Sequence, residues 1–154
     1  MNLQQGDKAP AFNLPTDGAG TCALADFAGN ALVLYFYPKN GSPGCTTEAQ
    51  DFRDAMSSFE KCGATVVGVS RDIVKKHDQF KATHDLNFTL ISDEDGALCK
   101  MYGVWAEKNL FGRKYMGIER STFLIDSEGK ISKTWRKIRV KGHVDAVLAA
   151  AQIL

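Results

Sequence analysis

Short apolar runs and amphipathic stretches alternate along the chain. The run ALVLYFY at residues 31–37 is continuous and rich in aromatic and branched side chains, which is typical of a strand buried on both faces of a sheet. PKNGSPG interrupts this run, and a helix is predicted from Pro43 to about Lys61. Apolar residues recur in that helix at steps of three and four: Ala49, Phe52, Met56 and Phe59. The two segments predict a buried strand that leads directly into an amphipathic helix.

The alternation continues to the C-terminus. Further strands are expected at residues 64–70, 88–92 and within 121–135, where a turn at 126–129 separates two of them. Asp72 is expected to cap a helix from about Ile73 to His84, a short helix is expected near 95–102, and a closing helix follows Gly142. Strands that alternate with helices and end in a hairpin predict an α/β fold with helices on both faces of the sheet. No repeat or linker divides the 154 residues, so we expect a single domain over 1–154.

Composition narrows the possible classes of protein. Hydrophobic residues make up 44% and charged residues 24%, the balance of a soluble globular protein, and the net charge of +1 gives no reason to expect nucleic acid as a partner. Six Lys or Arg residues between Lys130 and Lys141 are best interpreted as the solvated face of a strand. No apolar run could span a bilayer, and the first ten residues contain no apolar signal segment. We therefore expect a cytoplasmic protein without a membrane partner.

The four cysteines are scattered, and none lies in a CxxC pair. This spacing predicts free thiols rather than a disulfide scaffold or a zinc site, and His77 and His84 have no clustered partner for a metal. Cys45 differs from the others because it follows a helix start. Ser42 is expected at the N-cap and Pro43 at N1, which places Cys45 at N3. Unpaired N–H groups and the helix dipole there favour a thiolate, although a buried structural thiol in a first turn is the alternative.

The stretch YFYPKNGSPGCTTEAQDF resembles the active-site motif of peroxiredoxins, P-x-x-x-[T/S]-x-x-C, at Pro38, Ser42 and Cys45. Three further segments, GDKAPAFNLP, VWAEKNLFGRKYMGIERSTFLID and WRKIRVKGH, resemble the bacterioferritin comigratory protein or peroxiredoxin Q group. The similarity covers nearly the whole chain. It implies a thioredoxin-like fold, in which helices flank a central mixed sheet, and a thiol-dependent peroxidase with no bound cofactor or metal.

The resemblance also implies roles for individual residues. Cys45 is the peroxidatic nucleophile that becomes a sulfenic acid, Ser42 orients the peroxide, and Pro38 shields the pocket from water. Arg120, in ERSTF, stabilises the thiolate and polarises the O–O bond. Without the motif, the simplest interpretation of Arg120 is that it forms a salt bridge at the surface. Four aromatic residues are candidates for an apolar rim or simply for the core: Tyr35, Phe36, Trp105 and Phe111.

A second, resolving cysteine is missing from both positions where relatives carry it. Gln50 occupies one of these positions, and Lys81 occupies the other. Cys62 lies 17 residues further along the predicted helix, about 25 Å from Cys45 and beyond the roughly 7 Å that a disulfide allows. Cys99 is expected in the core, whereas Cys22 follows the Gly-rich loop DGAGT and is expected at the surface.

These observations predict a one-cysteine mechanism in which an external thiol reduces Cys45. The reductant would be thioredoxin, glutaredoxin or a small dithiol, the substrate a hydroperoxide, and the protein a monomer or weak dimer. A redox sensor that stalls after one oxidation is the main alternative. A thioredoxin-like disulfide reductase is disfavoured, because Cys45 has no CxxC partner.

Overall fold

A five-stranded mixed sheet forms the centre of the computed structural model, which describes residues 2–154. The strand order is β5-β4-β3-β8-β9. The strands span Thr89–Ser92 (β5), Ala64–Ser70 (β4), Ala31–Phe36 (β3), Ser121–Ile125 (β8) and Ile131–Trp135 (β9). β3 runs parallel to β4 and antiparallel to β8. The predicted strands and the predicted mixed sheet are therefore confirmed.

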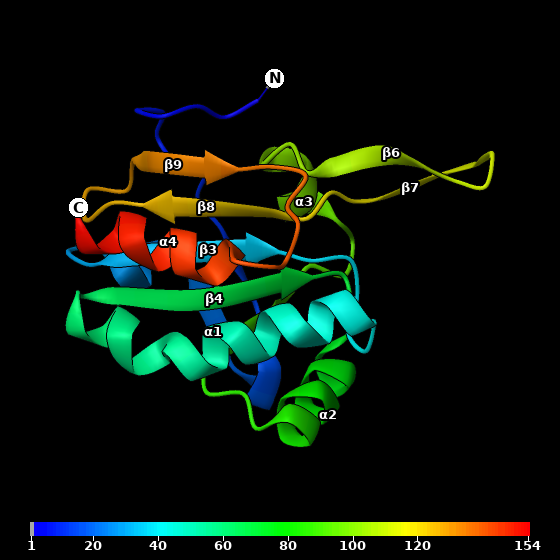
Figure 1. The fold of residues 1–154 in the computed structure, drawn as a ribbon, viewed down its shortest axis with the longest axis horizontal. Helices are drawn as coiled ribbons and strands as arrows, with labels where there is room; N and C mark the ends of the chain where they lie inside the picture. Colours follow the sequence, from blue (N-terminus) through cyan, green and yellow to red (C-terminus); the bar gives the residue numbers. More distant parts are fainter. Residues whose placement is uncertain (1) are drawn as a thin grey trace.

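Three helices cover one face of this sheet, as Figure 1 shows: α1 (Pro43–Lys61), α2 (Val74–His84) and α4 (His143–Gln152). Alternate residues of β3 point toward them, as expected for a strand buried on both faces. The side chains packed between this face and the helices form the α1-side core, which includes Val33, Tyr35, Phe52, Phe59, Leu124 and Val147. This core fixes α1 against the end of β3.

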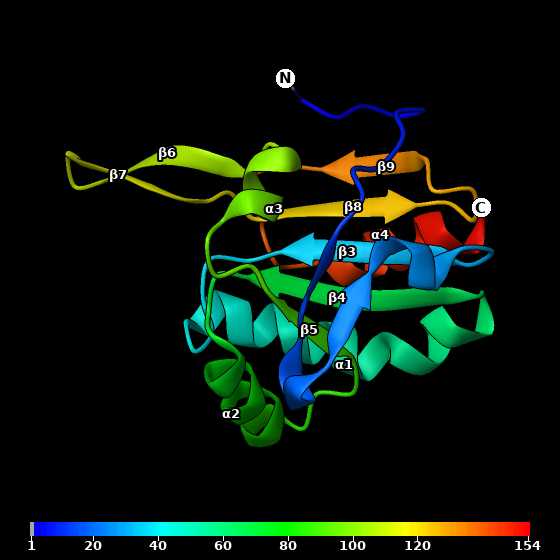
Figure 2. The ribbon, with the colours of Figure 1, turned by 180° about the vertical axis from the view of Figure 1, so that it is seen from behind.

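The opposite face is covered by α3 (Ala97–Met101) and by the N-terminal segment (Figure 2). That segment contains strands β1 (Asn13–Pro15) and β2 (Thr21–Ala23) and the short 3-10 helices η1 (Asp17–Ala19) and η2 (Leu24–Phe27). The side chains beneath them form the α3-side core, which includes Phe12, Cys22, Leu34, Phe36, Cys99 and Tyr102. Helices on both faces are therefore confirmed, with the N-terminal segment as an additional cover.

A long hairpin, β6 (Trp105–Leu110) and β7 (Arg113–Ile118), extends from one end of the molecule (Figures 1 and 2). The sequence patterns did not predict it. Its two loop residues, Phe111 and Gly112, both have positive φ angles, 53° and 81°, a combination that two-residue hairpin turns favour. Phe111 is 100% exposed, so it belongs neither to a core nor to a rim of the site.

Two local expectations were wrong. Asp72 does not cap α2, whose N-cap is Ile73; its carboxylate instead accepts hydrogen bonds from the Asn40 backbone N–H at 2.9 Å and the Ser70 hydroxyl at 2.6 Å. Cys22 is buried rather than exposed, because β2 directs it into the α3-side core. Among the helices within residues 2–154, none is long and apolar enough to cross a membrane.

Candidate active site

The loop after β3 brings Cys45 to the first turn of α1. Ser42 is the N-cap and Pro43 opens the helix, so Cys45 occupies N3 as predicted. The Thr46 N–H donates to the Ser42 carbonyl at 2.9 Å, which closes the first turn. Only 1% of Cys45 is exposed, and its sulfur lies at the positive end of a 19-residue helix. This position favours a negative charge on the sulfur.

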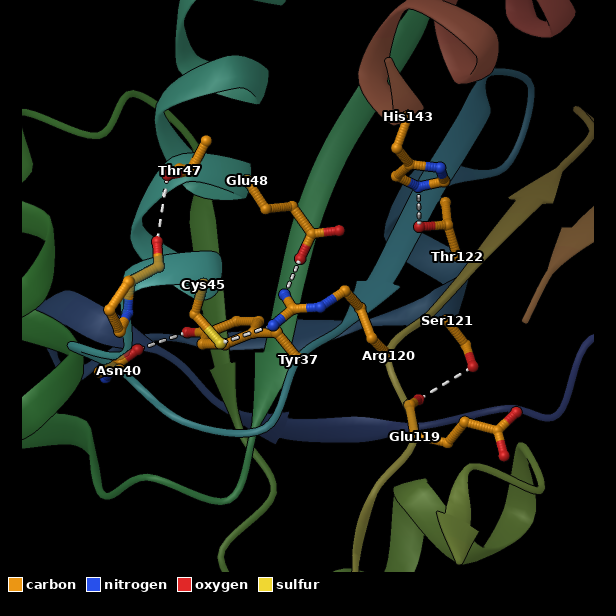
Figure 3. A network of polar contacts seen from close by, with 11 residues as sticks. Tyr37, Asn40, Cys45, Thr47, Glu48, Glu119, Arg120, Ser121, Thr122 and His143 are labelled. Carbon is orange, nitrogen blue, oxygen red and sulfur yellow. Dashed lines mark hydrogen bonds and ion pairs between the residues drawn. The ribbon is translucent and has the colours of Figure 1, made fainter. Parts of the chain in front are cut away.

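Arg120 lies between β7 and β8 and reaches across to α1 (Figure 3). Its Nη2 donates a hydrogen bond to Cys45 Sγ at 3.2 Å, and its Nη1 donates to Glu48 Oε1 at 2.6 Å. Gly44 permits this approach, because a Cβ atom at that position would lie only 3.3 Å from Nη2. The guanidinium therefore touches the sulfur and a carboxylate at the same time.

Glu48 was not among the residues that the sequence patterns singled out. It is 0% exposed, and its Oε2 has no hydrogen-bond partner. Burial raises the pKa of Glu48 to about 7, although Arg120 lowers it and Asp51 raises it further. The available signal was an acidic residue on the apolar stripe of α1, four positions before Phe52.

Another buried polar pair lies behind Arg120. Thr122 on β8 and His143 at the start of α4 are hydrogen-bonded, with Oγ1 and Nε2 2.8 Å apart. Burial and the nearby Arg120 charge lower the pKa of His143 to about 4. His143 is therefore neutral near pH 7, and Arg120 supplies the positive charge beside the sulfur.

Of the four residues singled out for the site, Cys45 and Arg120 are in contact. Ser42 is half-buried at the N-cap, but its side chain makes no capping hydrogen bond. Pro38 is half-buried and follows Tyr37 at the end of β3, in the loop that leads to Ser42. Among the rim candidates, Tyr35 and Phe36 are core residues, and Trp105 is half-buried with the Arg71 guanidinium over its ring.

Comparison with known proteins identifies the family. The model of the AhpC/TSA family matches residues 5–134. The chain belongs to the AhpC/TSA family. The putative peroxiredoxin bcp of Coxiella burnetii is 52% identical over 148 residues, which cover 96% of this chain and 98% of that protein. Peroxiredoxin Bcp of Bacillus subtilis is 50% identical over 96% of this chain and 94% of its own length.

Solved structures agree with this assignment. The structure of Xanthomonas campestris peroxiredoxin Q is 49% identical with a TM-score of 0.88, and it covers 92% of this chain and 90% of its own. A mutant of Xylella fastidiosa PrxQ gives a TM-score of 0.94 at 40% identity over 99% of this chain and 98% of its own. The resemblance to the peroxiredoxin Q group and the thioredoxin-like fold are thus confirmed. The chain is a thiol-dependent peroxidase, an oxidoreductase that acts on peroxides with thiol reductants.

The other cysteines of this peroxiredoxin lie away from Cys45. Cys22 and Cys99 are in the α3-side core, whereas Cys45 borders the α1-side core, so the central sheet separates them. Burial raises the pKa of Cys22 to about 11, and burial with the neighbouring Asp93 raises that of Cys99. Cys62 is the C-cap at the opposite end of α1. Across residues 2–154, no group of three or more His, Cys, Asp or Glu side chains could hold a metal ion.

Proposed function

We propose that this peroxiredoxin works with a single cysteine, Cys45, whose sulfenic acid is reduced by an external thiol. The observation that carries this proposal is the separation of Cys45 from every other cysteine by the sheet or by the length of α1. The contact between Cys45 Sγ and Arg120 supports the assignment of Cys45 as the peroxidatic residue.

In the proposed step, the Cys45 thiolate attacks the terminal oxygen of the hydroperoxide. An S–O bond forms, the O–O bond breaks, and the departing oxygen gains negative charge. Arg120 would donate hydrogen bonds to the sulfur and the peroxide as this charge develops. Ser42 would orient the peroxide, which is supported by the absence of a capping bond from its side chain, and Pro38 would exclude water.

The positions where relatives carry a resolving cysteine support the same mechanism. Gln50 lies on α1, and Lys81 lies on α2 with its ammonium 2.8 Å from the Asp17 carboxylate. Cys62 is about 25 Å from Cys45 along the helix. Cys22 and Cys99 are buried thiols whose raised pKa values make them poor nucleophiles. A disulfide to Cys45 would therefore require part of the fold to open.

The substrates we propose are hydrogen peroxide and small organic hydroperoxides. The solved bacterioferritin comigratory protein of Xanthomonas campestris is described with an alkyl peroxide reduction activity, which supports the organic class. Thioredoxin, glutaredoxin or a small dithiol would return Cys45 to its thiol. We further propose a cytoplasmic monomer or weak dimer that folds as one domain.

Replacing Cys22, Cys62 and Cys99 together by alanine tests the one-cysteine mechanism. With dithiothreitol as the reductant, steady-state peroxide consumption by the folded triple variant should stay within about two-fold of the wild type, since these thiols take no part in the cycle. Cys45→Ser serves as the inactive control. Loss of turnover in a triple variant that still forms the Cys45 sulfenic acid would show that one of the three thiols is needed. A wild type that consumes only one peroxide per chain would instead indicate a redox sensor.

A further inference from the structure

One guanidinium serves two acidic groups in the buried site. Arg120 donates to Cys45 Sγ at 3.2 Å and to Glu48 Oε1 at 2.6 Å, and its side chain is only 15% exposed. If Cys45 and Glu48 were both ionised, the three groups would carry a net charge of −1 away from water. Burial of an uncompensated charge is strongly unfavourable, so a proton on Glu48 stabilises the reduced site.

The second oxygen of Glu48 is consistent with a protonated carboxyl. Oε2 is buried and accepts no hydrogen bond, whereas a buried carboxylate normally has partners for both oxygens. The Tyr35 hydroxyl is likewise buried and has no hydrogen-bond partner, and the charge of Glu48 contributes to the raised pKa of Tyr35. Burial places the pKa of Glu48 at about 7, so small changes in nearby charge decide whether it holds a proton.

Groups from each neighbouring element contribute to this balance. The titratable groups near Glu48 and Arg120 are Cys45 and Asp51 on α1, Tyr35 on β3, Tyr37 after it, Lys108 on β6 and His143 on α4. Burial raises the pKa values of both tyrosines and lowers that of His143, so these three are neutral near pH 7. The oxidation of Cys45 does not alter Asp51 or Lys108 chemically. Cys45 is the one neighbour whose charge the reaction changes.

We propose that Glu48 is a proton reservoir of the peroxidase reaction: it holds a proton while Cys45 is a thiolate and releases one when Cys45 becomes a sulfenic acid. Oxidation removes the negative charge from the sulfur, so the full charge of Arg120 then stabilises the Glu48 carboxylate. The site remains neutral in both states. This inference rests on the proposed role of Cys45 as the peroxidatic thiolate.

The atoms and charges of the step balance. The thiolate takes the terminal OH of the hydroperoxide as S–OH, the O–O bond breaks, and the other oxygen leaves as an alkoxide or hydroxide. That oxygen gains one proton to become an alcohol or water, while Glu48 loses one. The enzyme therefore exchanges no net proton with solvent. Without a titratable group at position 48, each oxidation would consume one proton from solvent.

Proton uptake during a single turnover tests this proposal. The wild type, Glu48→Gln and Asp54→Asn, an exposed carboxylate on the same helix, would each be mixed with one equivalent of hydrogen peroxide at about pH 8 in weak buffer with an indicator dye. We expect close to zero protons per sulfenic acid for the wild type and for Asp54→Asn, and close to one for Glu48→Gln. The amide introduced by Glu48→Gln keeps the shape of the side chain and an oxygen that accepts from Arg120, so a structural role alone would not change this stoichiometry.

Trapping the sulfenic acid in the same samples separates two kinds of failure. Absence of a trapped adduct at Cys45 would overturn the proposed function, whereas equal proton uptake by the wild type and Glu48→Gln with normal oxidation would overturn only the role of Glu48. If Glu48→Gln does not fold, infrared difference spectra of the wild type give the answer. Oxidation should remove the band of a protonated carboxyl group, and persistence of that band would contradict the proposal.

Discussion

Arg120 combines properties that a lysine could not supply at the same place. Its planar guanidinium directs separate N–H groups at the Cys45 sulfur and at Glu48, and Gly44 leaves room for it. An ammonium carries the same charge, but it lacks the fixed fork of donors. The geometry of the two hydrogen bonds should therefore matter in addition to the charge.

Arg120→Lys should lower kcat/KM for hydrogen peroxide by about 10²–10³-fold, because an aligned donor to the reacting atoms is lost. Stopped-flow oxidation of the reduced enzyme measures this directly. Arg53→Lys is the matched control, since Arg53 is a half-buried arginine of α1 whose guanidinium contacts Asp54 and the His84 carbonyl instead of Cys45, and it should keep the wild-type rate. A loss smaller than about three-fold in Arg120→Lys would show that charge alone is sufficient.

Glu48 should also leave a signature in the pH dependence of stability. Its pKa is raised on folding, so the folded protein binds this proton more tightly than the unfolded chain, and stability decreases as the pH rises from about 4.5 to 7. Glu48→Gln removes this contribution. Relative to the wild type, its free energy of unfolding should be similar near pH 4.5 and higher by up to about 3 kcal/mol near pH 8.

Urea denaturation of both proteins across this range measures the difference. His143 has the opposite effect in the wild type, because its lowered pKa makes stability decrease as the pH falls toward about 4. Comparison of the two proteins cancels that contribution. A stability difference that does not vary with pH would contradict the titration of Glu48.

The residues of the site differ in how well the sequence predicts them. The position of Cys45 followed from local helix-start rules at Ser42 and Pro43, which the structure confirms. Arg120 has no local signal, because 75 residues separate it from Cys45 and only the fold brings them together. It was found through the family resemblance. Glu48 was missed because the periodicity of apolar residues identifies the buried face of a helix, but it does not show which distant residue would pair with a charged side chain on that face.

At the scale of elements, strands with two buried faces were the most predictable. The run at β3 is continuous and apolar because alternate residues enter the α1-side and α3-side cores. The β6–β7 hairpin gave no such signal, since most of its side chains are exposed and its turn has Phe-Gly instead of Asn-Gly. Cys22 was misplaced for a related reason: a Gly-rich loop does not reveal that the next short strand is buried.

The turn of this hairpin provides a test of backbone energetics. Phe111 has a φ of 53° and a fully exposed side chain, so it has an unfavourable backbone conformation without compensating burial. Phe111→Asn should raise the free energy of unfolding by about 0.5–1 kcal/mol and leave peroxidase activity unchanged. Leu110→Asn is the control, because Leu110 lies within β6 and is also exposed. An equal gain from both substitutions in urea denaturation would show that turn conformation is not the cause.

At the scale of the whole molecule, the fold isolates one thiol from the other three. The sheet separates Cys45 from Cys22 and Cys99, and α1 places Cys62 at its far end. A disulfide between Cys45 and any of the other three cysteines would require movement across the sheet or along the length of α1. The arrangement therefore supports reduction of the sulfenic acid by a molecule from outside.

The most direct measurement is the intact mass of the reduced protein after one equivalent of hydrogen peroxide, quenched under denaturing conditions with a sulfenic-acid trap. The one-cysteine mechanism predicts one trapped adduct, located on the peptide that contains Cys45, and no disulfide. Loss of two hydrogens, together with a peptide that links Cys45 to Cys22, Cys62 or Cys99, would contradict it and would show that the fold opens during the cycle.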